Sequence, residues 1–410
     1  MTTDSARALL RRLGVFLDGF SACFSRQPQR DAASRYLDGL FNDSERKSMQ
    51  AMHGRLSDPG QYQALQHFIT TSPWDAARVW TQLRTTVPVR LGILAIDDTG
   101  FPKQGTHSVG VQRQYCGTLG KIGNCQVAVS SALIADGRTW PLAWDLYLPA
   151  SWMEDPARRA AAGIPGTQVF REKWRIALAQ VRTILKAGFT LTGVVVDADY
   201  GSNAAFRDGL ERLGLAYGVA IRGEAVFAIA DVPDTQTATA IADSAPEDQW
   251  ALVTWGAGTQ GPLTARFCAV RVRPTQGRGD RWLLCERSAT DERKYYLLHL
   301  PDTTPLRDLV ALARSRWPIE QQYRELKDDL GLDHFEGRSY RGWQHHVVLT
   351  AVAFTFLQLE RGRAPTAAVR ATLPTMRGWV REIFGLLYVI HSRRLMGMLT
   401  SFQRNPPLRR

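Results

Sequence analysis

Cysteine is scarce in this sequence, and its spacing excludes two kinds of cross-linked domain. The 410 residues include five cysteines, an odd number, and no two of them have a C-x2-C or C-x4-C spacing. This pattern argues against a zinc site and against a disulfide framework. We therefore expect a fold that depends on its hydrophobic core, in a reducing cytoplasm.

Long apolar runs are also missing, as are low-complexity tracts and internal repeats. The residues after Met1 read Thr-Thr-Asp-Ser and lack the charged region and apolar core of a signal peptide, so none is expected. The apolar run at 347–359 is too short to span a bilayer. We predict that this run forms a buried helix and that the protein has no membrane partner.

Acidic residues are outnumbered by basic ones. The formal net charge is +12 and the pI is about 9.8. Residues 361–410 contain ten arginines but one acidic residue, Glu382. A balance this basic in a large chain favours a polyanionic partner, nucleic acid first. A basic enzyme without such a partner is the alternative.

The apolar pattern divides the chain into five predicted segments. Residues 1–88 have helical spacing. Residues 89–221 contain a meander of strands followed by alternating helix and strand, which predicts an α/β fold with a mixed sheet flanked by helices. Residues 222–303 are predicted to be an inserted, antiparallel β-rich subdomain, and 304–360 return to helices. Residues 361–410 form a basic helical tail.

Some of these elements have specific predicted bounds. Strands are expected at 89–96, 105–112 and 190–196, and a loop is expected at 231–248. Two tail helices are expected at 364–372 and 376–400.

One stretch near the end of the predicted core has charges at helical spacing. Arg316, Glu320, Arg324 and Lys327 would lie on one face, because a helix turns once every 3.6 residues. A carboxylate between cations is suited to holding a phosphate and its metal ion. An ordinary surface ion pair at i,i+4 is the alternative.

Two aspartates follow predicted strands upstream. Asp98 comes after the first strand and Asp197 after a later one. With Glu320 they form a sparse carboxylate set that can hold Mg²⁺, which takes one or two protein carboxylates plus phosphate and water. A pair of such ions about 3.5–4 Å apart can serve both oxygens of an in-line displacement. Alternatively, Asp98 caps a turn, and Asp197 and Asp199 only flank the end of a strand.

Several longer motifs accompany these residues: FNDSERK at 41–47, DDTGFPK at 97–103, QYCGTLGK at 114–121, VDADYG at 196–201 and GLDHFEGRS at 331–339. With them the chain resembles the DDE transposases of bacterial insertion sequences. The similarity is greatest to the branch numbered seven-hundred-and-one, a neighbour of family four. It extends from Phe41 to about Leu359.

The resemblance implies an RNase H-like core with a β-strand insertion before the last carboxylate. It implies that Asp98, Asp197 and Glu320 are catalytic and bind Mg²⁺ or Mn²⁺, as two ions. The implied reaction is cleavage at the element's ends followed by strand transfer into target DNA. The implied partners are the terminal inverted repeats, the target DNA and a second copy of the chain on DNA, in a bacterial, nucleoid-associated setting.

The family's Y-x2-R-x3-E-x6-K signature places its arginine and lysine on Arg316 and Lys327, as clamps for phosphate, and Arg324 would neutralise further phosphates. Its tyrosine position falls on Ala313, a departure from the pattern. Tyr296 is the implied equivalent of an aromatic residue that holds a flipped base, although a tyrosine in a strand core is an equal interpretation. Trp317 is expected either to stack on a base or simply to pack within the protein.

Other functions fit the sequence less well. The segment at 117–122 has the wrong spacing for a P-loop. The H-x-x-R at 391–394 is not followed by the tyrosine of a tyrosine recombinase. A two-carboxylate sugar hydrolase would not account for the basic charge. A non-catalytic DNA-binding descendant of a transposase is the main alternative, and it predicts that a carboxylate is lost.

Overall fold

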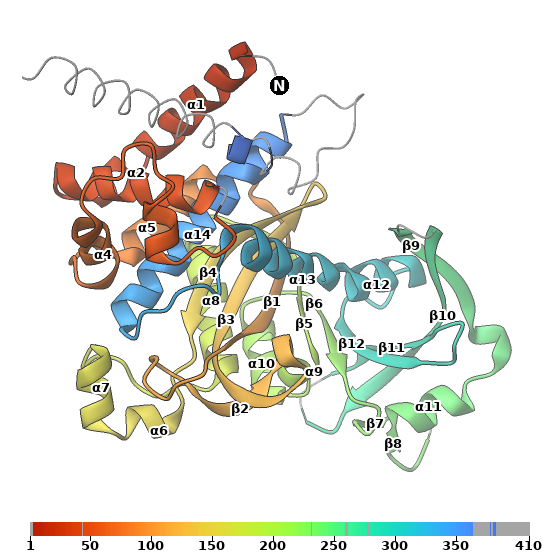
Figure 1. The fold of residues 1–410 in the computed structure, drawn as a ribbon. Coiled ribbons are helices and arrows are strands. Elements are labelled where there is room, and N and C mark those ends of the chain that lie inside the picture. The colour runs from red at the N-terminus through yellow and green to blue at the C-terminus, as the bar shows by residue number, and fades with distance from the viewer. Residues whose placement is uncertain are drawn as a thin grey trace, which may run out of the picture.

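The structure is a computed structural model of the 410-residue chain, and it describes residues 3–42, 44–230, 232–258, 261–276, 279–363, 378 and 380–382. The predicted tail helices at 364–372 and 376–400 lie almost wholly outside the described residues. A large mixed sheet extends through the molecule, with helices on both faces (Figure 1). The predicted α/β class, consistent with an RNase H-like core, is therefore confirmed.

The N-terminal helices pack around one long helix near the C-terminal end of the described chain. This helix, α14 (Tyr340–Arg361), is buried along almost its whole length, so the run at 347–359 is indeed a buried helix. In the described part of the chain, no helix is both long and apolar enough to cross a membrane. The helices around α14 are α1 (Thr3–Asp18), α2 (Gln27–Phe41), α3 (Met49–His53), α4 (Tyr62–Thr70) and α5 (Ala76–Thr86).

The core of the sheet combines parallel and antiparallel strands. Its central strands β1, β5 and β6 are parallel, and β3 pairs antiparallel with β1 and carries both β2 and β4 on its other edge. The bounds are β1 (Leu91–Pro102), β2 (Gln112–Cys116), β3 (Lys121–Ala135), β4 (Arg138–Leu146), β5 (Thr190–Val196) and β6 (Tyr217–Ile221).

Alternation along the strands sorts the core into two layers, because successive side chains point to opposite faces of a sheet. Ala95 and Val195 pack in the layer that includes α12 (Leu306–Ala313), α13 (Trp317–Arg324) and α14. Leu94 and Val194 pack in the layer that includes α8 (Lys173–Lys186) and α10 (Ala204–Arg212). Figure 1 shows α12 and α13 crossing in front of the strands, with α8 and α10 behind them.

The strands of the predicted insertion continue the core sheet, since β12 pairs with β6. The predicted loop at 231–248 is wrong in its second half, where Thr237 caps a short helix. These elements are β7 (Val226–Ala228), β8 (Gln236–Thr237), α11 (Ala238–Ser244), β9 (Ala251–Gly258), β10 (Gly261–Pro274), β11 (Arg281–Arg287) and β12 (Arg293–His299).

Two strand predictions near the first aspartates were wrong. The first strand does not stop at residue 96 but runs to Pro102, because Asp97 to Pro102 pair with β3. The strand expected at 105–112 is absent, and β2 begins at Gln112. Gly110 adopts φ +74° there, which ends extended structure. The remaining short elements are α6 (Ala150–Met153), α7 (Pro156–Ala162), α9 (Ala198–Gly201) and single turns at 21–23, 117–119, 247–249 and 314–316.

Candidate active site

The longer first strand sends two neighbouring carboxylates to opposite faces of the sheet. Asp97 lies opposite Ser130 and Asp98 opposite Val129, both within the β1–β3 pairing. Asp97 therefore shares a face with Ala95, on the side of α13, and Asp98 points to the side of α8. The sequence prediction placed Asp98 after the strand and did not assign a role to Asp97.

Asp98 is held by two donors that the sequence prediction missed. Lys173, the first residue of α8, donates to Oδ2, and the Tyr200 hydroxyl donates to Oδ1. Burial lowers the pKa of Lys173, but its bond to Asp98 raises the pKa above the ordinary value. Tyr200 belongs to the VDADYG motif, so a signal for it was available. Lys173 begins an amphipathic helix, and nothing local distinguishes it.

Asp197 comes directly after β5, as predicted, and caps α9. Its Oδ1 accepts bonds from the backbone N–H of Asp199 at 3.1 Å and of Tyr200 at 3.2 Å. Because Ala95 pairs with Val195 across the parallel strands, Asp97 and Asp197 each lie two residues further along. Burial, and then the charge of Asp98, raises the pKa of Asp197.

Asp97 is the most buried carboxylate of this group. Burial raises its pKa to about 7, Arg316 opposes the rise, and Asp197 and Asp98 add to it. Its Oδ1 accepts a bond from the N–H of Asp98 at 2.8 Å, and its Oδ2 pairs with Nη1 of Arg316. The three aspartates are thus close enough to interact electrostatically.

Glu320 lies on the solvent side of α13, where it pairs with Arg316 Nη2 at 2.5 Å. One guanidinium therefore joins Asp97 to Glu320. Pro318 falls in the first turn of this helix, where proline is tolerated. Within the described chain, no group of three or more His, Cys, Asp or Glu side chains is arranged to hold a metal ion. The structure places Asp97, Arg316 and Glu320 together on the α13 face, with Asp197 close enough to act on the charge of Arg316. Asp98 lies on the other face with Lys173 and Tyr200.

The predicted charged stripe along this helix is broken at Lys327. The exposed positions are Trp317, Glu320, Arg324 and Asp328, whereas Lys327 is buried with 9% of its surface exposed. The reason is a turn of π-helix over Glu325–Asp329. Its i→i+5 bonding shifts the residues around the axis relative to an α-helix. Arg324 remains available to solvent, with a bond at 3.4 Å to Gln321.

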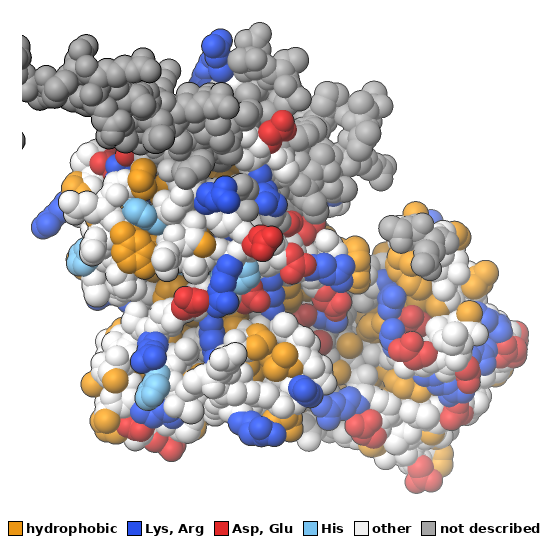
Figure 2. Space-filling model, viewed as in Figure 1, with side chains coloured by type: hydrophobic (Ala, Val, Ile, Leu, Met, Phe, Trp, Pro, Cys, Tyr) orange, Lys and Arg blue, Asp and Glu red, His pale blue; other side chains and the backbone are white. Residues whose placement is uncertain are grey.

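A cavity of about 560 Å³, lined by charged, aromatic and aliphatic side chains, lies between the core and the inserted strands. Trp317, 61% exposed, lies at this cavity with Glu320 and Arg316. Tyr296 also lines it but is 7% exposed, and its hydroxyl donates to Glu286 and accepts from Arg314. The cavity's other basic side chains are Arg222, Arg293, Lys294 and Arg314. Figure 2 shows charged side chains around the hollow in this region.

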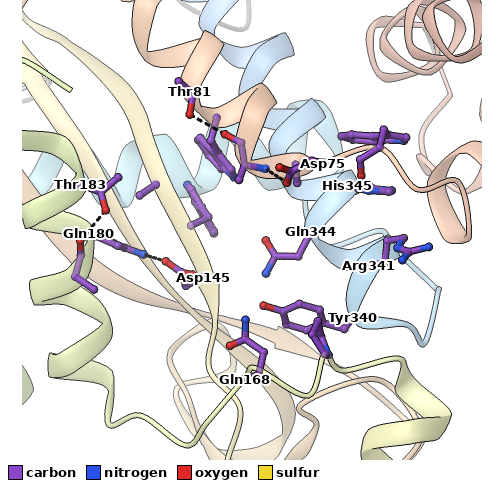
Figure 3. A pocket seen from close by; sticks show the side chains of 18 of the residues that line it. Asp75, Thr81, Asp145, Gln168, Gln180, Thr183, Tyr340, Arg341, Gln344 and His345 are labelled. Atoms are coloured by element: carbon purple, nitrogen blue, oxygen red, sulfur yellow. Dashed lines mark hydrogen bonds between the residues drawn. The ribbon is translucent and has the colours of Figure 1, made fainter. Parts of the chain in front are cut away.

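Another cavity, of about 570 Å³, includes none of the predicted site residues. It lies between α5, β4, α8 and the start of α14, and Figure 3 shows Gln180 bonded to Asp145 on its wall. The carboxylate chemistry therefore identifies the candidate site better than cavity size does.

Two family models and one relative match large parts of the chain. A family model described as "DDE superfamily endonuclease" matches residues 19–241, and one described as "Transposase DDE domain" matches residues 175–356. The chain is similar to a Microchaete diplosiphon protein described as "Probable transposase for insertion sequence element IS701". Identity is 36% over 196 residues, which covers 46% of this chain and 48% of that protein. The match thus spans about half the length of this curated relative.

Proposed function

The chain belongs to the DDE superfamily of endonucleases and transposases, and we propose that it cleaves DNA at the ends of an insertion sequence and joins them to a target. The resemblance seen in the sequence is thereby confirmed at the level of the family. The observation that supports the activity most is the set of acidic side chains at β1, β5 and α13, with Arg316 among them.

The chemistry of these side chains fits a hard divalent cation such as Mg²⁺ or Mn²⁺. Mg²⁺ prefers oxygen ligands and is usually held by one or two carboxylates, substrate phosphate and water. Repulsion from Asp98 contributes to the raised pKa of Asp197, and a bound cation would relieve it. We propose that Asp98 and Asp197 would hold the ions and that Glu320 is the third ligand. When bound, a pair of such ions activates the attacking oxygen and stabilises the leaving oxygen.

The other residues of the site orient these carboxylates. Lys173 and Tyr200 bond both oxygens of Asp98 and so fix its rotamer. Asp197 is fixed by the backbone N–H groups at the start of α9. Arg316, charged and 27% exposed at its side chain, would contact a phosphate beside Glu320.

The cavity beside Glu320 is the proposed place for the DNA end. Its basic side chains suit a phosphate backbone, and Trp317 offers an exposed ring on which a base can stack. Tyr296 lies behind it in the strand core, where it would support such a base through Arg314. Arg324, on the exposed side of α13, would contact a further phosphate. We propose that two copies of the chain act together on the two ends.

Cleavage of a plasmid that carries the gene with its flanking DNA tests this function. The wild-type protein should cut at the element's ends in Mg²⁺ and not in EDTA. Asp98→Asn or Glu320→Gln should remove cutting while DNA binding is retained, because the variants keep the side-chain shape and lose a metal-binding charge.

A control variant in the same motif is Asp199→Asn. Asp199 is 68% exposed at its side chain and pairs with Arg222 on the surface, so its loss should leave most of the cutting intact. Undiminished cleavage by Asp98→Asn and Glu320→Gln would contradict the proposed function.

A further inference from the structure

The turn in the QYCGTLGK motif has no part in the proposed chemistry, yet it contacts both sides of the candidate site. Thr118 lies in the single helical turn between β2 and β3, and its hydroxyl donates to the Gly100 carbonyl at 2.8 Å. Gly100 is two residues beyond Asp98 on β1. The same hydroxyl accepts a bond from Lys327 Nζ at 2.7 Å. Lys327 also donates to the Gly100 carbonyl, at 2.9 Å.

These three bonds connect segments that are distant in the sequence. Lys327 is 227 residues from Gly100 and 209 from Thr118. It is also seven residues beyond Glu320, on the π-helical turn that continues α13. The link therefore joins the helix of Glu320 to the strand of Asp98, beside the turn that closes the β2–β3 hairpin.

The junction is tightly packed. A Cβ on Gly100 would lie 2.5 Å from Cys116 Sγ, closer than real contacts allow. The Lys327 ammonium also lies 5.5 Å from the centre of the Phe101 ring. With 9% of its surface exposed, Lys327 points into the protein. A lysine ammonium has three donors, and two of them already bind protein oxygens here.

We propose that Thr118 is a positioning residue, and that with Lys327 it fixes α13 against β1 so that Glu320 and Asp98 keep their separation. This inference rests on the proposed function of those two carboxylates. It replaces the phosphate-clamping role that the family signature implies for Lys327. The π-helical turn explains the position of Lys327, because it rotates this residue from the exposed side of the helix toward Gly100 and Thr118.

The expected effect of breaking the link is large on turnover and small on DNA affinity. A catalytic group misplaced by about 1 Å can slow a reaction about 10²-fold. Thr118→Val keeps the volume and removes the hydroxyl, so it should lower the cleavage rate by about that factor without weakening binding. Thr118→Ser keeps the hydroxyl and should retain most of the rate.

Binding to a mixed-sequence DNA duplex at several salt concentrations tests the role of Lys327. The salt slope is the slope of the logarithm of the binding constant against the logarithm of the salt concentration. Replacing a lysine that contacts phosphate reduces this slope by about one. Lys327→Met should leave the slope unchanged, and Arg324→Gln, on the exposed side of the same helix, should reduce it. The double variant Thr118→Val with Lys327→Met should cleave no more slowly than the slower of the two single variants. The reason is that each single variant already breaks the same link, so the second change removes nothing further.

The outcomes separate this proposal from the proposed function. Loss of cutting in Asp98→Asn with full cutting in Thr118→Val would overturn the positioning role alone. A reduced salt slope in Lys327→Met would show that Lys327 contacts a phosphate. This measurement does not depend on cleavage activity. If Lys327→Met does not fold, the cleavage rates of Thr118→Val and Thr118→Ser still test the positioning role. Equal cleavage rates for these two variants would contradict it.

Discussion

The adjacent Asp97 and Asp98 point to opposite faces of the sheet, and their side chains differ in exposure and in ion-pair partner. On the α13 face, Asp97 is 11% exposed at its side chain and pairs with Arg316. On the α8 face, Asp98 is 21% exposed and pairs with Lys173, which is itself 36% exposed. The α13 pair is the more enclosed of the two, although Arg316 is itself 27% exposed.

This difference predicts separate roles for the two carboxylates, metal binding for Asp98 and support of Arg316 for Asp97. The more open carboxylate would accept a metal ion on its remaining lone pairs while Lys173 and Tyr200 hold its rotamer. The enclosed carboxylate holds the arginine that reaches Glu320. We therefore expect changes at Asp98 to affect chemistry and changes around Asp97 to affect stability as well.

The largest expected effect distinguishes the two aspartates directly. Asp98→Asn should reduce cleavage to background, because it removes a proposed metal ligand. Asp97→Asn should slow cleavage by about 10–100-fold, the usual range for groups that orient a ligand. Rates on the same plasmid under identical Mg²⁺ measure both. Equal loss in the two variants would mean that both faces supply ligands.

A second prediction compares the cations of the two faces by protein stability. Arg316→Gln leaves Asp97 enclosed without its partner and should lower the free energy of unfolding by about 3 kcal/mol, the low end for a broken buried pair. Lys173→Met breaks a more exposed pair and should cost less than about 1 kcal/mol. Urea denaturation of both variants checks this, and similar losses would remove the distinction between the faces.

A third prediction concerns a carboxylate away from the sheet. Burial raises the pKa of Asp38, on α2, from 3.8 to about 7, and Arg35 opposes the rise. Between these values the folded protein holds a proton that the unfolded chain has released. Stability should therefore fall as pH rises from about 4 to 7, by about 1.4 kcal/mol for each unit of pKa difference.

Asp38→Asn should reduce that pH dependence, as measured by denaturation across the same range, while the contribution of Asp97, whose pKa burial also raises to about 7, remains. Asp38 has no role in cleavage in this account, so the variant also shows how much of the pH response belongs to the site. An unchanged pH profile would mean that Asp38 is not the responsible group.

Local patterns predicted the regular elements and missed what depends on distant partners. The apolar, β-branched run at 190–196 matches β5 residue for residue. The first strand was predicted too short because its apolar run ends at Ile96, while pairing with β3 keeps Asp97 and Asp98 extended. The prediction that Asp98 and Glu320 belong to the catalytic set remains a prediction.

The same limit explains the unexpected position of Lys327. Its spacing from Glu320 fits an α-helical stripe, and no local signal announced the π-helical turn. The Arg316–Asp97 pair joins residues 219 apart, so sequence spacing could not reveal it. The resemblance to a family indicated candidate carboxylates but not the residues, such as Lys173 and Tyr200, that bond to them.

The central claim, that Asp98, Asp197 and Glu320 bind a divalent cation, can be tested without DNA. Fe²⁺ bound in place of Mg²⁺ generates hydroxyl radicals with peroxide and cuts the polypeptide near its ligands. The account predicts cuts near these three residues, suppressed by excess Mg²⁺ and absent in Asp98→Asn. Cuts confined to other parts of the chain, or unchanged in Asp98→Asn, would contradict it.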